Sequence, residues 1–380
     1  MTNATVVSVC GDPGGASALA PVIKVLKSER RVRLVVYAYN EGIEVMRRCN
    51  VSSVSLPNPI DADWVSRRLA EDRASLVLTG TSHNGLDWEK LFISSSHSAG
   101  VPSISVLDFW SNYALRFGDD CGGLTYIPDM IAVMDERARD EMIAGGFSGK
   151  NIVVTGQPAF DALAECRRQF SAARRSATCA ALGLTADDLL VVFVSQPLRR
   201  LSGECNDDPR FLGFDEESVL SSVITSLGTT SGKTDRCITL LIRPHPRDRT
   251  AWSRDDGAPG VKVLVSTSGD GRDDVMASDL VVGMNSILLV EACYLGGIVL
   301  SVQPELRRVD TLPTNRSGAS VGVYREEDIG PAIESLLLDA EVRCAAAART
   351  ACLPRSGGAA RRVVNHVYAW LFSSASCPVS

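Results

Sequence analysis

Two stretches of this sequence decide the fold: Arg-Pro-His-Pro-Arg-Asp at 243–248, and Ala-Ser-Asp-Leu-Val-Val-Gly-Met-Asn-Ser-Ile-Leu-Leu-Val-Glu-Ala at 277–292. The first ends an apolar, strand-like run in a cationic loop that contains a histidine. The second leads a strand into a small polar turn that opens a helix. Parallel α/β sheets bind ligands at the carboxyl ends of their strands, where helix N-termini offer free N–H groups and a partial positive charge. Together the two stretches predict an anion and nucleotide pocket for a phosphorylated ligand.

Each stretch also has a structural explanation. A lone histidine between prolines shapes a turn, and a strand followed by serine and a helix occurs in any Rossmann-like unit. The order and spacing of the two stretches favour the pocket.

Length and composition indicate a globular chain of two domains. The 380 residues are 45% hydrophobic and 22% charged, which excludes a disordered or fibrous protein. A net charge of −6 argues against a nucleic-acid partner and against a polybasic membrane anchor. The 11 cysteines form no C-x-x-C pair or Cys/His cluster, and residues 1–11 lack the charged-then-apolar pattern of a leader, so we expect reduced thiols in the cytoplasm. No apolar run reaches the ~20 residues that span a bilayer, although a peripheral membrane contact is left open.

Strand-like and helical segments alternate along the chain. Helices are expected at 18–28, 136–145 and 162–182, with a glycine-rich turn at 11–17. The expected strands are 5–10, 32–37, 75–78, 103–107, 130–134, 151–154, 189–194, 238–242, 261–265, 280–282 and 298–302. This alternation predicts an α/β protein with two Rossmann-like series and a boundary near 155–158.

Five motifs occur in the order that one superfamily uses. They are Gly11-Asp12-Pro13-Gly14-Gly15-Ala16 with Pro21-Val22-Ile23, Val154-Thr155-Gly156-Gln157-Pro158 with Asp161, the His-Pro loop, Asn285-Ser286, and Glu291-Ala292. On these motifs the chain resembles the GT-B superfamily, which includes nucleotide-sugar glycosyltransferases and the non-hydrolysing UDP-GlcNAc 2-epimerases. The His-Pro loop with a later serine is also similar to bacterial sialyltransferases and CDP-glycerol polymerases. The resemblance implies two Rossmann-like domains facing each other across a cleft: an acceptor domain at 1–157, a donor domain at 158–360, and a C-terminal helix and tail at 361–380.

The resemblance assigns the nucleotide to the C-terminal half. It implies that Asn285 and Ser286 contact the phosphates and that Glu291 accepts hydrogen bonds from the ribose. These residue types suit the roles, because Ser and Asn cap helices and a carboxylate has two oxygens for a diol. A carboxylate on the helix surface is the alternative for Glu291.

The same resemblance places cations at the diphosphate. Arg199 or Arg200 follows the first strand of the second half and is expected to bind it with charge-assisted bonds. His245 and Arg243 are expected beside the diphosphate or the sugar, with His245 stabilising the leaving group. A solvated arginine pair and a turn histidine are the alternatives.

Two residues of the first half are candidates for the general base. Asp108 follows the strand at 103–107, where GT-B transferases often place a base that takes the proton from an acceptor hydroxyl. His83, in the loop after the strand at 75–78, is the second choice.

The surroundings of the base come from glycines and aromatic residues. Gly14 and Gly15 would let the backbone approach a ligand closely, although a tight turn needs the same residues. Trp110 and Tyr113 offer flat faces for a sugar or an aromatic acceptor, with packing between the domains as the alternative.

Two departures from the epimerase pattern favour transfer over epimerisation. The Arg-Pro-Glu signature appears as Gln303-Pro304-Glu305, and Thr81 stands where an acidic residue is expected. We therefore expect a glycosyltransferase that needs neither cofactor nor metal and moves a sugar from a nucleotide-sugar, with UDP among the nucleotides, to a small-molecule or glycan acceptor. An epimerase and a non-catalytic nucleotide-sugar-binding protein are the alternatives, and a homodimer is left open.

Overall fold

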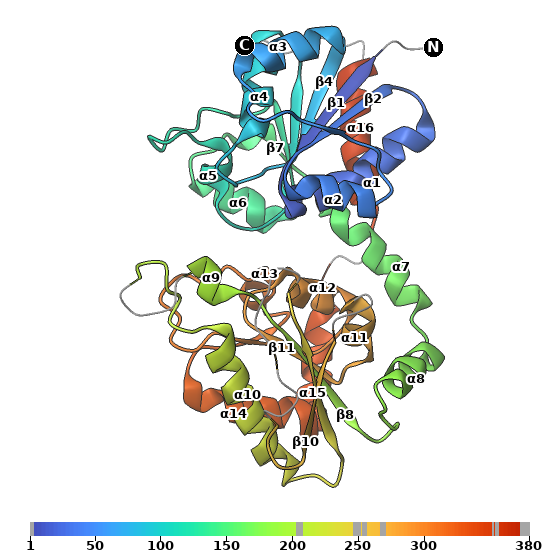
Figure 1. Ribbon diagram of the computed structural model, residues 1–380, viewed down its shortest axis with the longest axis vertical. Helices are drawn as coiled ribbons and strands as arrows, with labels where there is room; N and C mark the ends of the chain where they lie inside the picture. Colours follow the sequence, from blue (N-terminus) through green and yellow to red (C-terminus); the bar gives the residue numbers. More distant parts are fainter. Residues whose placement is uncertain are drawn as a thin grey trace. The chain divides into compact units, whose positions relative to one another are not determined.

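The computed structural model describes residues 4–202, 208–245, 252, 257–266, 271–351, 353 and 357–372. The chain forms two compact units: residues 1–162 with 356–380, and residues 163–355. Each unit is a parallel sheet covered by helices (Figure 1). Within the described part of the chain, no helix combines the length and apolar character needed to span a membrane.

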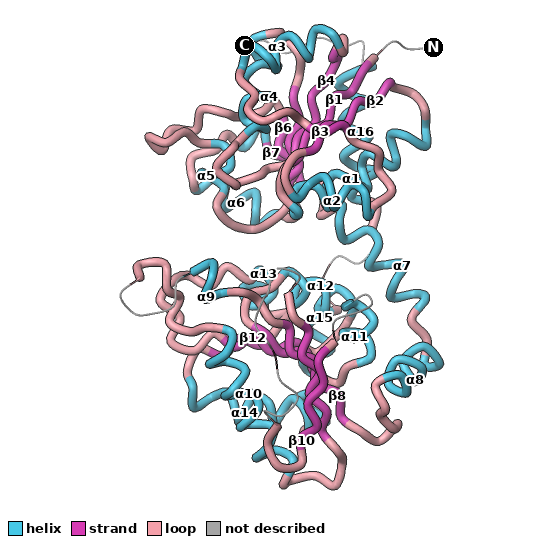
Figure 2. Tube along the Cα trace, viewed as in Figure 1, coloured by secondary structure: helices cyan, strands magenta, loops and turns pink. Residues whose placement is uncertain are grey.

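The sheet of unit 1 has seven parallel strands in the order β3-β2-β1-β4-β5-β6-β7. Figure 2 draws the strands of both units in magenta and the helices in cyan. All six residues of β1 are buried, which explains its β-branched sequence, because parallel strands are covered on both faces. The strands are β1 (Thr5–Cys10), β2 (Arg33–Ala38), β3 (Val54–Ser55), β4 (Ala74–Thr79), β5 (Ser103–Val106), β6 (Met130–Val133) and β7 (Ile152–Val154).

Helices cover both faces of this sheet. The helices of unit 1 are α1 (Pro13–Glu29), α2 (Glu41–Arg48), α3 (Ala62–Glu71), α4 (Trp88–Ser98), α5 (Tyr113–Phe117), α6 (Glu136–Ala144) and α16 (Ala359–Phe372), with 3-10 turns η1 (Gly149–Asn151) and η2 (Pro158–Phe160). On one face Val6 packs with residues of α1 and α16, and on the other Val7 packs with α3 and α4. Adjacent strand residues thus belong to opposite cores.

The final helix belongs to unit 1 because the motif at 154–161 fastens it there. Both carboxylate oxygens of Asp161 accept backbone N–H bonds, from Ala359 and Ala360, each at 2.8 Å. Arg362 Nε donates to the carbonyl oxygen of Thr155 at 2.6 Å. Asp161 therefore caps α16, as a carboxylate at a helix N-terminus does.

The sheet of unit 2 has six parallel strands in the order β10-β9-β8-β11-β12-β13. They are β8 (Leu189–Val194), β9 (Ile238–Arg243), β10 (Val261–Val265), β11 (Leu280–Gly283), β12 (Val299–Val302) and β13 (Val321–Val323). The helices are α7 (Asp161–Gln169), α8 (Ala172–Ala181), α9 (Leu198–Ser202), α10 (Glu216–Ser231), α11 (Gly271–Ala277), α12 (Ile287–Leu295), α13 (Pro313–Ser317), α14 (Glu326–Leu338) and α15 (Ala340–Thr350). Residues of α10 and α14 pack against β8 and β9 in one core.

Four expectations about the elements need correction. Helix α1 begins at Pro13, so most of the expected glycine-rich turn is helical. The helix expected at 162–182 is two helices, because α7 ends at Gln169 and Ser171 caps α8. The short strands β3 and β13 were not expected. The units divide after residue 162 rather than 157, and the last helix joins the first unit.

Candidate active site

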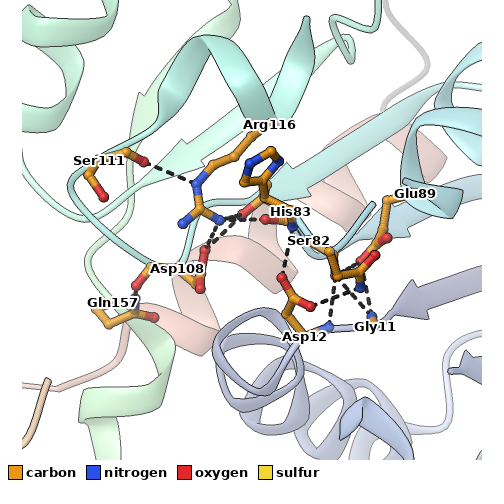
Figure 3. A network of polar contacts seen from close by, with 11 residues as sticks. Gly11, Asp12, Ser82, His83, Glu89, Asp108, Ser111, Arg116 and Gln157 are labelled. Carbon is orange, nitrogen blue, oxygen red and sulfur yellow. Dashed lines mark hydrogen bonds and ion pairs between the residues drawn. The ribbon is translucent and has the colours of Figure 1, made fainter. Parts of the chain in front are cut away.

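The strand order of unit 1 reverses between β1 and β4, which lie side by side at the centre of the sheet. Parallel α/β sheets bind ligands at the carboxyl ends of the strands beside such a reversal. Here the loops at that point contain Gly11 and Asp12 after β1, and residues 80–84 after β4. A polar network joins the two loops (Figure 3).

Glu89 of α4 is the buried centre of this network. Its carboxylate accepts from Gly11 N–H at 3.0 Å and from the hydroxyl groups of Ser82 and Tyr39. The side chain is 3% exposed, and this burial raises the pKa of Glu89 above its ordinary value of 4.5. Ser82 Oγ also accepts from the N–H groups of Gly11 and Asp12, at 3.1 and 2.8 Å. Glu89 therefore fixes the loop after β1 through Ser82.

Asp12 stands at the N-cap position of α1 but does not cap it. Its two oxygens instead accept from the loop after β4: Oδ2 from His83 N–H and Oδ1 from Asn84 Nδ2, both at 2.8 Å. The residue is partly exposed. Among the described residues Asp12 forms no ion pair, and its carboxylate accepts hydrogen bonds only from these two N–H donors.

Asp108, the first candidate for the general base, is held in an ion pair. Arg116 Nη1 lies 2.5 Å from Asp108 Oδ1, and the side chains are 9% and 11% exposed. Thr81 Oγ1 donates to the same oxygen at 2.9 Å. Arg116 also donates to the carbonyl oxygen of Thr81. Figure 3 shows its bond to the carbonyl oxygen of Ser111. The Asp108 side chain therefore links three loops within unit 1.

The two glycines expected to approach a ligand instead approach the protein itself. A Cβ at position 14 would lie 1.9 Å from Asp108 Oδ2, so only glycine leaves room for this carboxylate. A Cβ at position 15 would lie 3.3 Å from Gly80 Cα and from Thr81 N. Gly14 and Gly15 thus allow α1 to begin against the loops after β4 and β5.

The aromatic candidates also have partners within unit 1. Trp110 is 2% exposed, donates from Nε1 to Asp135 at 2.8 Å and stacks on Phe160 with ring centroids 6.3 Å apart. Its expected role as a face for the acceptor is wrong, because the ring is covered. Tyr113 is partly buried and its hydroxyl donates to Glu141 at 2.8 Å.

His83, the second candidate for the base, is exposed. Its backbone N–H contacts Asp12, whereas its ring points away from that carboxylate in Figure 3.

In unit 2 the expected strand, polar turn and helix are present as β11, Asn285-Ser286 and α12. Ser286 is the N-cap and its Oγ accepts from Leu288 N–H at 3.3 Å. Asn285 N–H donates to Gln196 Oε1 at 2.9 Å, while its Oδ1 is buried and has no partner among the described residues. The turn therefore has the form expected for a phosphate site.

Glu291 of α12 forms a two-bond ion pair with Arg272 of α11. Arg272 Nε donates to Oε2 and Nη2 to Oε1, each at 2.9 Å, in the fork arrangement of guanidinium and carboxylate. The Glu291 side chain is 13% exposed. A carboxylate has about four acceptor positions, so this pair leaves two of them free.

The other expected donor-binding cations differ in their surroundings. Arg199 pairs with Glu217 of α10 and lies 3.5 Å from Asp215, whereas Arg200 is exposed. Arg243, the last residue of β9, contacts Ser266 Oγ at 3.0 Å and Asp274 Oδ2 at 3.2 Å. His245 lies two residues beyond β9 and is partly buried, and the remainder of its loop, 246–250, lies outside the described residues.

Comparison with protein-family models gives no match, and no curated protein matches the chain. Solved structures do match over almost the full length. A UDP-GlcNAc 2-epimerase from Neisseria meningitidis, bound to UDP-GlcNAc, has a TM-score of 0.67 at 14% identity, with 96% of this chain and 99% of that chain covered. The chain has the GT-B fold. A glycosyltransferase from Rickettsia africae matches with a TM-score of 0.66 at 10% identity, covering 98% and 100%. MurG from Acinetobacter baumannii matches with a TM-score of 0.60 at 12% identity, covering 96% and 99%.

The sequence did not single out three residues that shape these sites: Asp12, Arg116 and Arg272. The Asp at the end of a central strand was a signal for the first. No sequence pattern identifies Arg116 or Arg272, because the sequence does not show which carboxylate an arginine contacts.

Proposed function

We propose that this chain is a glycosyltransferase that moves a sugar from a nucleotide-sugar to an acceptor hydroxyl. The observation that carries the proposal is the state of the carboxylates at the carboxyl edge of the unit 1 sheet. Asp108 is paired with Arg116, and Glu89 is buried beneath Ser82 and Tyr39.

That state favours transfer over epimerisation. Epimerisation at C2 removes a proton, eliminates the nucleotide and adds it back, and so uses several acidic or basic groups. Group transfer needs one base and a stabilised leaving group. All three carboxylates labelled in Figure 3 accept internal hydrogen bonds, Glu89 is buried and Asp108 is in an ion pair, and Thr81 replaces a fourth. The remaining set suits a reaction with one base.

The donor is proposed to bind unit 2 at the turn before α12. Asn285 and Ser286 would face the diphosphate, and Glu291 would accept from the ribose hydroxyls. Leaving-group charge would be stabilised by the α12 N-terminus together with His245 and an arginine, without a resident metal ion or cofactor. Two of the matching solved structures contain UDP-GlcNAc or UDP, which supports a uridine nucleotide as the first to test.

Epimerase activity is the second candidate, because several of the matching solved structures carry that name. A thermal-shift panel of UDP, GDP, TDP, CDP and CMP identifies the nucleotide, since a ligand at 100 times its Kd stabilises by about 2.7 kcal/mol. The corresponding nucleotide-sugars are then incubated with the protein. Slow release of free nucleotide supports a transferase, whereas interconversion of two sugars without release contradicts the proposal. A protein that binds but changes no donor is a binding module.

A further inference from the structure

We propose that a cavity of about 390 Å³ at the amino edge of the unit 2 sheet is a second ligand site, which binds a small aromatic carboxylate and thereby tightens nucleotide binding. All of its lining residues belong to unit 2. The proposed nucleotide site lies at the opposite, carboxyl edge of the same sheet, so the two sites are distinct. The cavity is independent of the proposed function, whereas its coupling to the nucleotide rests on it.

The cavity lies where four helices come together before the start of β11 and β12. The helices contribute Arg167 (α7), Met276 (α11), Leu295 (α12) and Arg343 (α15). Part of the wall is Gly296–Gly297, and the space beside it stays open because glycine has no side chain. The volume lies in the lower part of the range for small-molecule pockets, which is about 300–1,000 Å³.

Arg167 provides a cation that is open to a ligand. The other three arginines of α7 and α8 pair with carboxylates: Arg168 with Glu165, Arg174 with Asp273 and Arg175 with Asp279. Among the described residues, Arg167 forms no hydrogen bond or ion pair. Its Nε, Cζ and Nη2 atoms lie 3.8, 3.9 and 4.0 Å from the position of a Cβ at residue 296, so the plane of the guanidinium faces Gly296. The N–H edges of the group stay open, and such an edge binds a carboxylate through two parallel hydrogen bonds.

The surroundings of Arg167 favour a ligand with a single negative charge. Helices α7, α11 and α12 all end beside the cavity, and the carbonyl groups at a helix C-terminus carry partial negative charge. Asp279 adds a carboxylate, with Arg343 3.7 Å away. Arg343 also donates to the carbonyl oxygen of Leu336 at 2.8 Å, so this second cation is already engaged. A carboxylate suits this balance of charge better than a phosphate dianion does.

The apolar part of the lining favours an aromatic ring. Phe170, directly after α7, is half-buried and lines the cavity together with Met276 and Leu295. Aromatic rings gain specific contacts with another ring and with a thioether, which an aliphatic chain does not. The lining therefore matches a ring that carries one carboxylate.

The cavity touches the far ends of two helices that form the proposed ribose contact. Ser286 caps the start of α12, and Leu295 at its other end lines the cavity, about 13 Å away along the helix. Helix α11 carries Arg272, the partner of Glu291, near its start and Met276 near its end. A ligand between the two far ends holds α11 and α12 against each other and favours the arrangement with Glu291 in place. Nucleotide binding should therefore tighten.

The test measures binding of 2-naphthoate to the whole chain by isothermal titration, with 2-naphthamide as the neutral compound of the same shape. The carboxylate is expected to bind about tenfold more tightly than the amide, the lower end of the range for bonds to a charged group, because Arg167 is exposed. Arg167→Gln should remove this preference. Arg168→Gln is the matched control and should bind like wild type, since Arg168 lies next to it on α7, pairs with Glu165 and does not line the cavity.

A second pair of variants tests the location independently of charge. Ala347→Leu adds a larger side chain to the lining, and Ala345→Leu adds the same side chain to α15 outside the cavity. Both positions are exposed and leucine favours a helix, so both variants should fold, which thermal melting checks. Only Ala347→Leu should weaken the binding of 2-naphthoate.

Coupling is measured by repeating the titrations with the other ligand at saturation. Saturating 2-naphthoate should tighten UDP binding about fivefold, and saturating UDP should tighten 2-naphthoate binding by the same factor, because coupling is reciprocal. An unchanged or weakened UDP affinity would overturn the coupling.

Three outcomes would overturn the second site itself. They are equal binding of the acid and the amide or of neither, equal effects of Arg167→Gln and Arg168→Gln, and displacement of 2-naphthoate by UDP, which would place the probe in the nucleotide site. A protein that binds 2-naphthoate as expected but no nucleotide of the panel would refute the proposed function and the coupling, and would leave the second site in place.

Discussion

Replacing Glu291 by glutamine tests the proposed ribose contact. The carboxylate receives two bonds of 2.9 Å from Arg272 and keeps about two free acceptor positions. Glutamine keeps one acceptor oxygen and loses the charge. Hydrogen bonds to a charged group contribute about 1.5–3 kcal/mol, so UDP should bind about 10- to 150-fold more weakly.

The same substitution also affects stability, and the two effects must be separated. Arg272 would lose these two charge-assisted bonds at 26% side-chain exposure. Exposed pairs contribute up to about 1 kcal/mol and breaking fully buried ones costs about 3–5 kcal/mol, so an intermediate cost of about 1–3 kcal/mol is expected. Chemical denaturation of the ligand-free protein measures this cost independently of binding.

Isothermal titration with UDP and 2′-deoxy-UDP provides the decisive comparison. Wild-type protein should prefer the ribonucleotide, and Glu291→Gln should reduce that preference. Arg272→Lys is the matched control, because it keeps the charge but cannot form the fork, so its effect should be smaller than that of Arg272→Gln. The reasoning is refuted if folded Glu291→Gln binds UDP with wild-type affinity, or if Arg272→Gln tightens binding, which would mean that Arg272 competes with the ribose.

Three further substitutions test separate contacts. Burial raises the pKa of Glu89 above its ordinary value of 4.5. The stability that Glu89 contributes is therefore present below pH 4.5 and is lost as pH rises through the pKa of the folded state. Glu89→Gln does not titrate, so its melting temperature should rise relative to that of wild type between about pH 5 and 8, and a constant difference would contradict this. His245→Ala should lower turnover more than donor binding, because charge on the leaving group develops in the transition state; equal losses in both would indicate ground-state binding. Asp161→Ala should destabilise by about 0.5–2 kcal/mol and speed amide exchange in α16, where Ala359 and Ala360 lose their acceptor; unchanged exchange there would show that packing alone holds this helix.

The central strands could be predicted because burial on both faces requires nearly continuous apolar sequence. The expected ranges 5–10, 189–194 and 261–265 coincide with β1, β8 and β10. The two missed strands have no such signal. Strand β3 has two residues, both exposed, and β13 has three, so neither contains enough residues for a pattern to appear.

The start of α1 shows where local preference fails. Glycines at 14 and 15 disfavour a helix when the chain is considered alone. In the folded unit Asp108 occupies the space of a side chain at position 14, and the backbone of Gly80 lies tightly against position 15. A contact 94 residues away in the sequence thus decides the residue type at position 14, and local sequence carries no trace of it.

Local sequence also does not reveal which charged side chains pair with each other. The resemblance pointed to the carboxylates of Asp108 and Glu291, but not to the cations that hold them. Arg116 and Arg272 stand 8 and 19 residues from their partners, distances that suit many acids in the chain. For Asp108 this omission changes the interpretation, because an acid bound to a buried guanidinium is a poor candidate for a base.

Asp12 shows how a contact that is distant in the sequence can override a local rule. Aspartate before Pro-Gly-Gly at a helix start is typical of an N-cap, a role that contributes about 1 kcal/mol to stability. Here the carboxylate leaves the α1 N–H groups without a side-chain cap and turns to the loop after β4, 71 and 72 residues away. A residue selected only to stabilise α1 would accept from that helix. Local rules are broken most often where function imposes its own geometry, and this one is broken at the reversal of the sheet, where a ligand is expected.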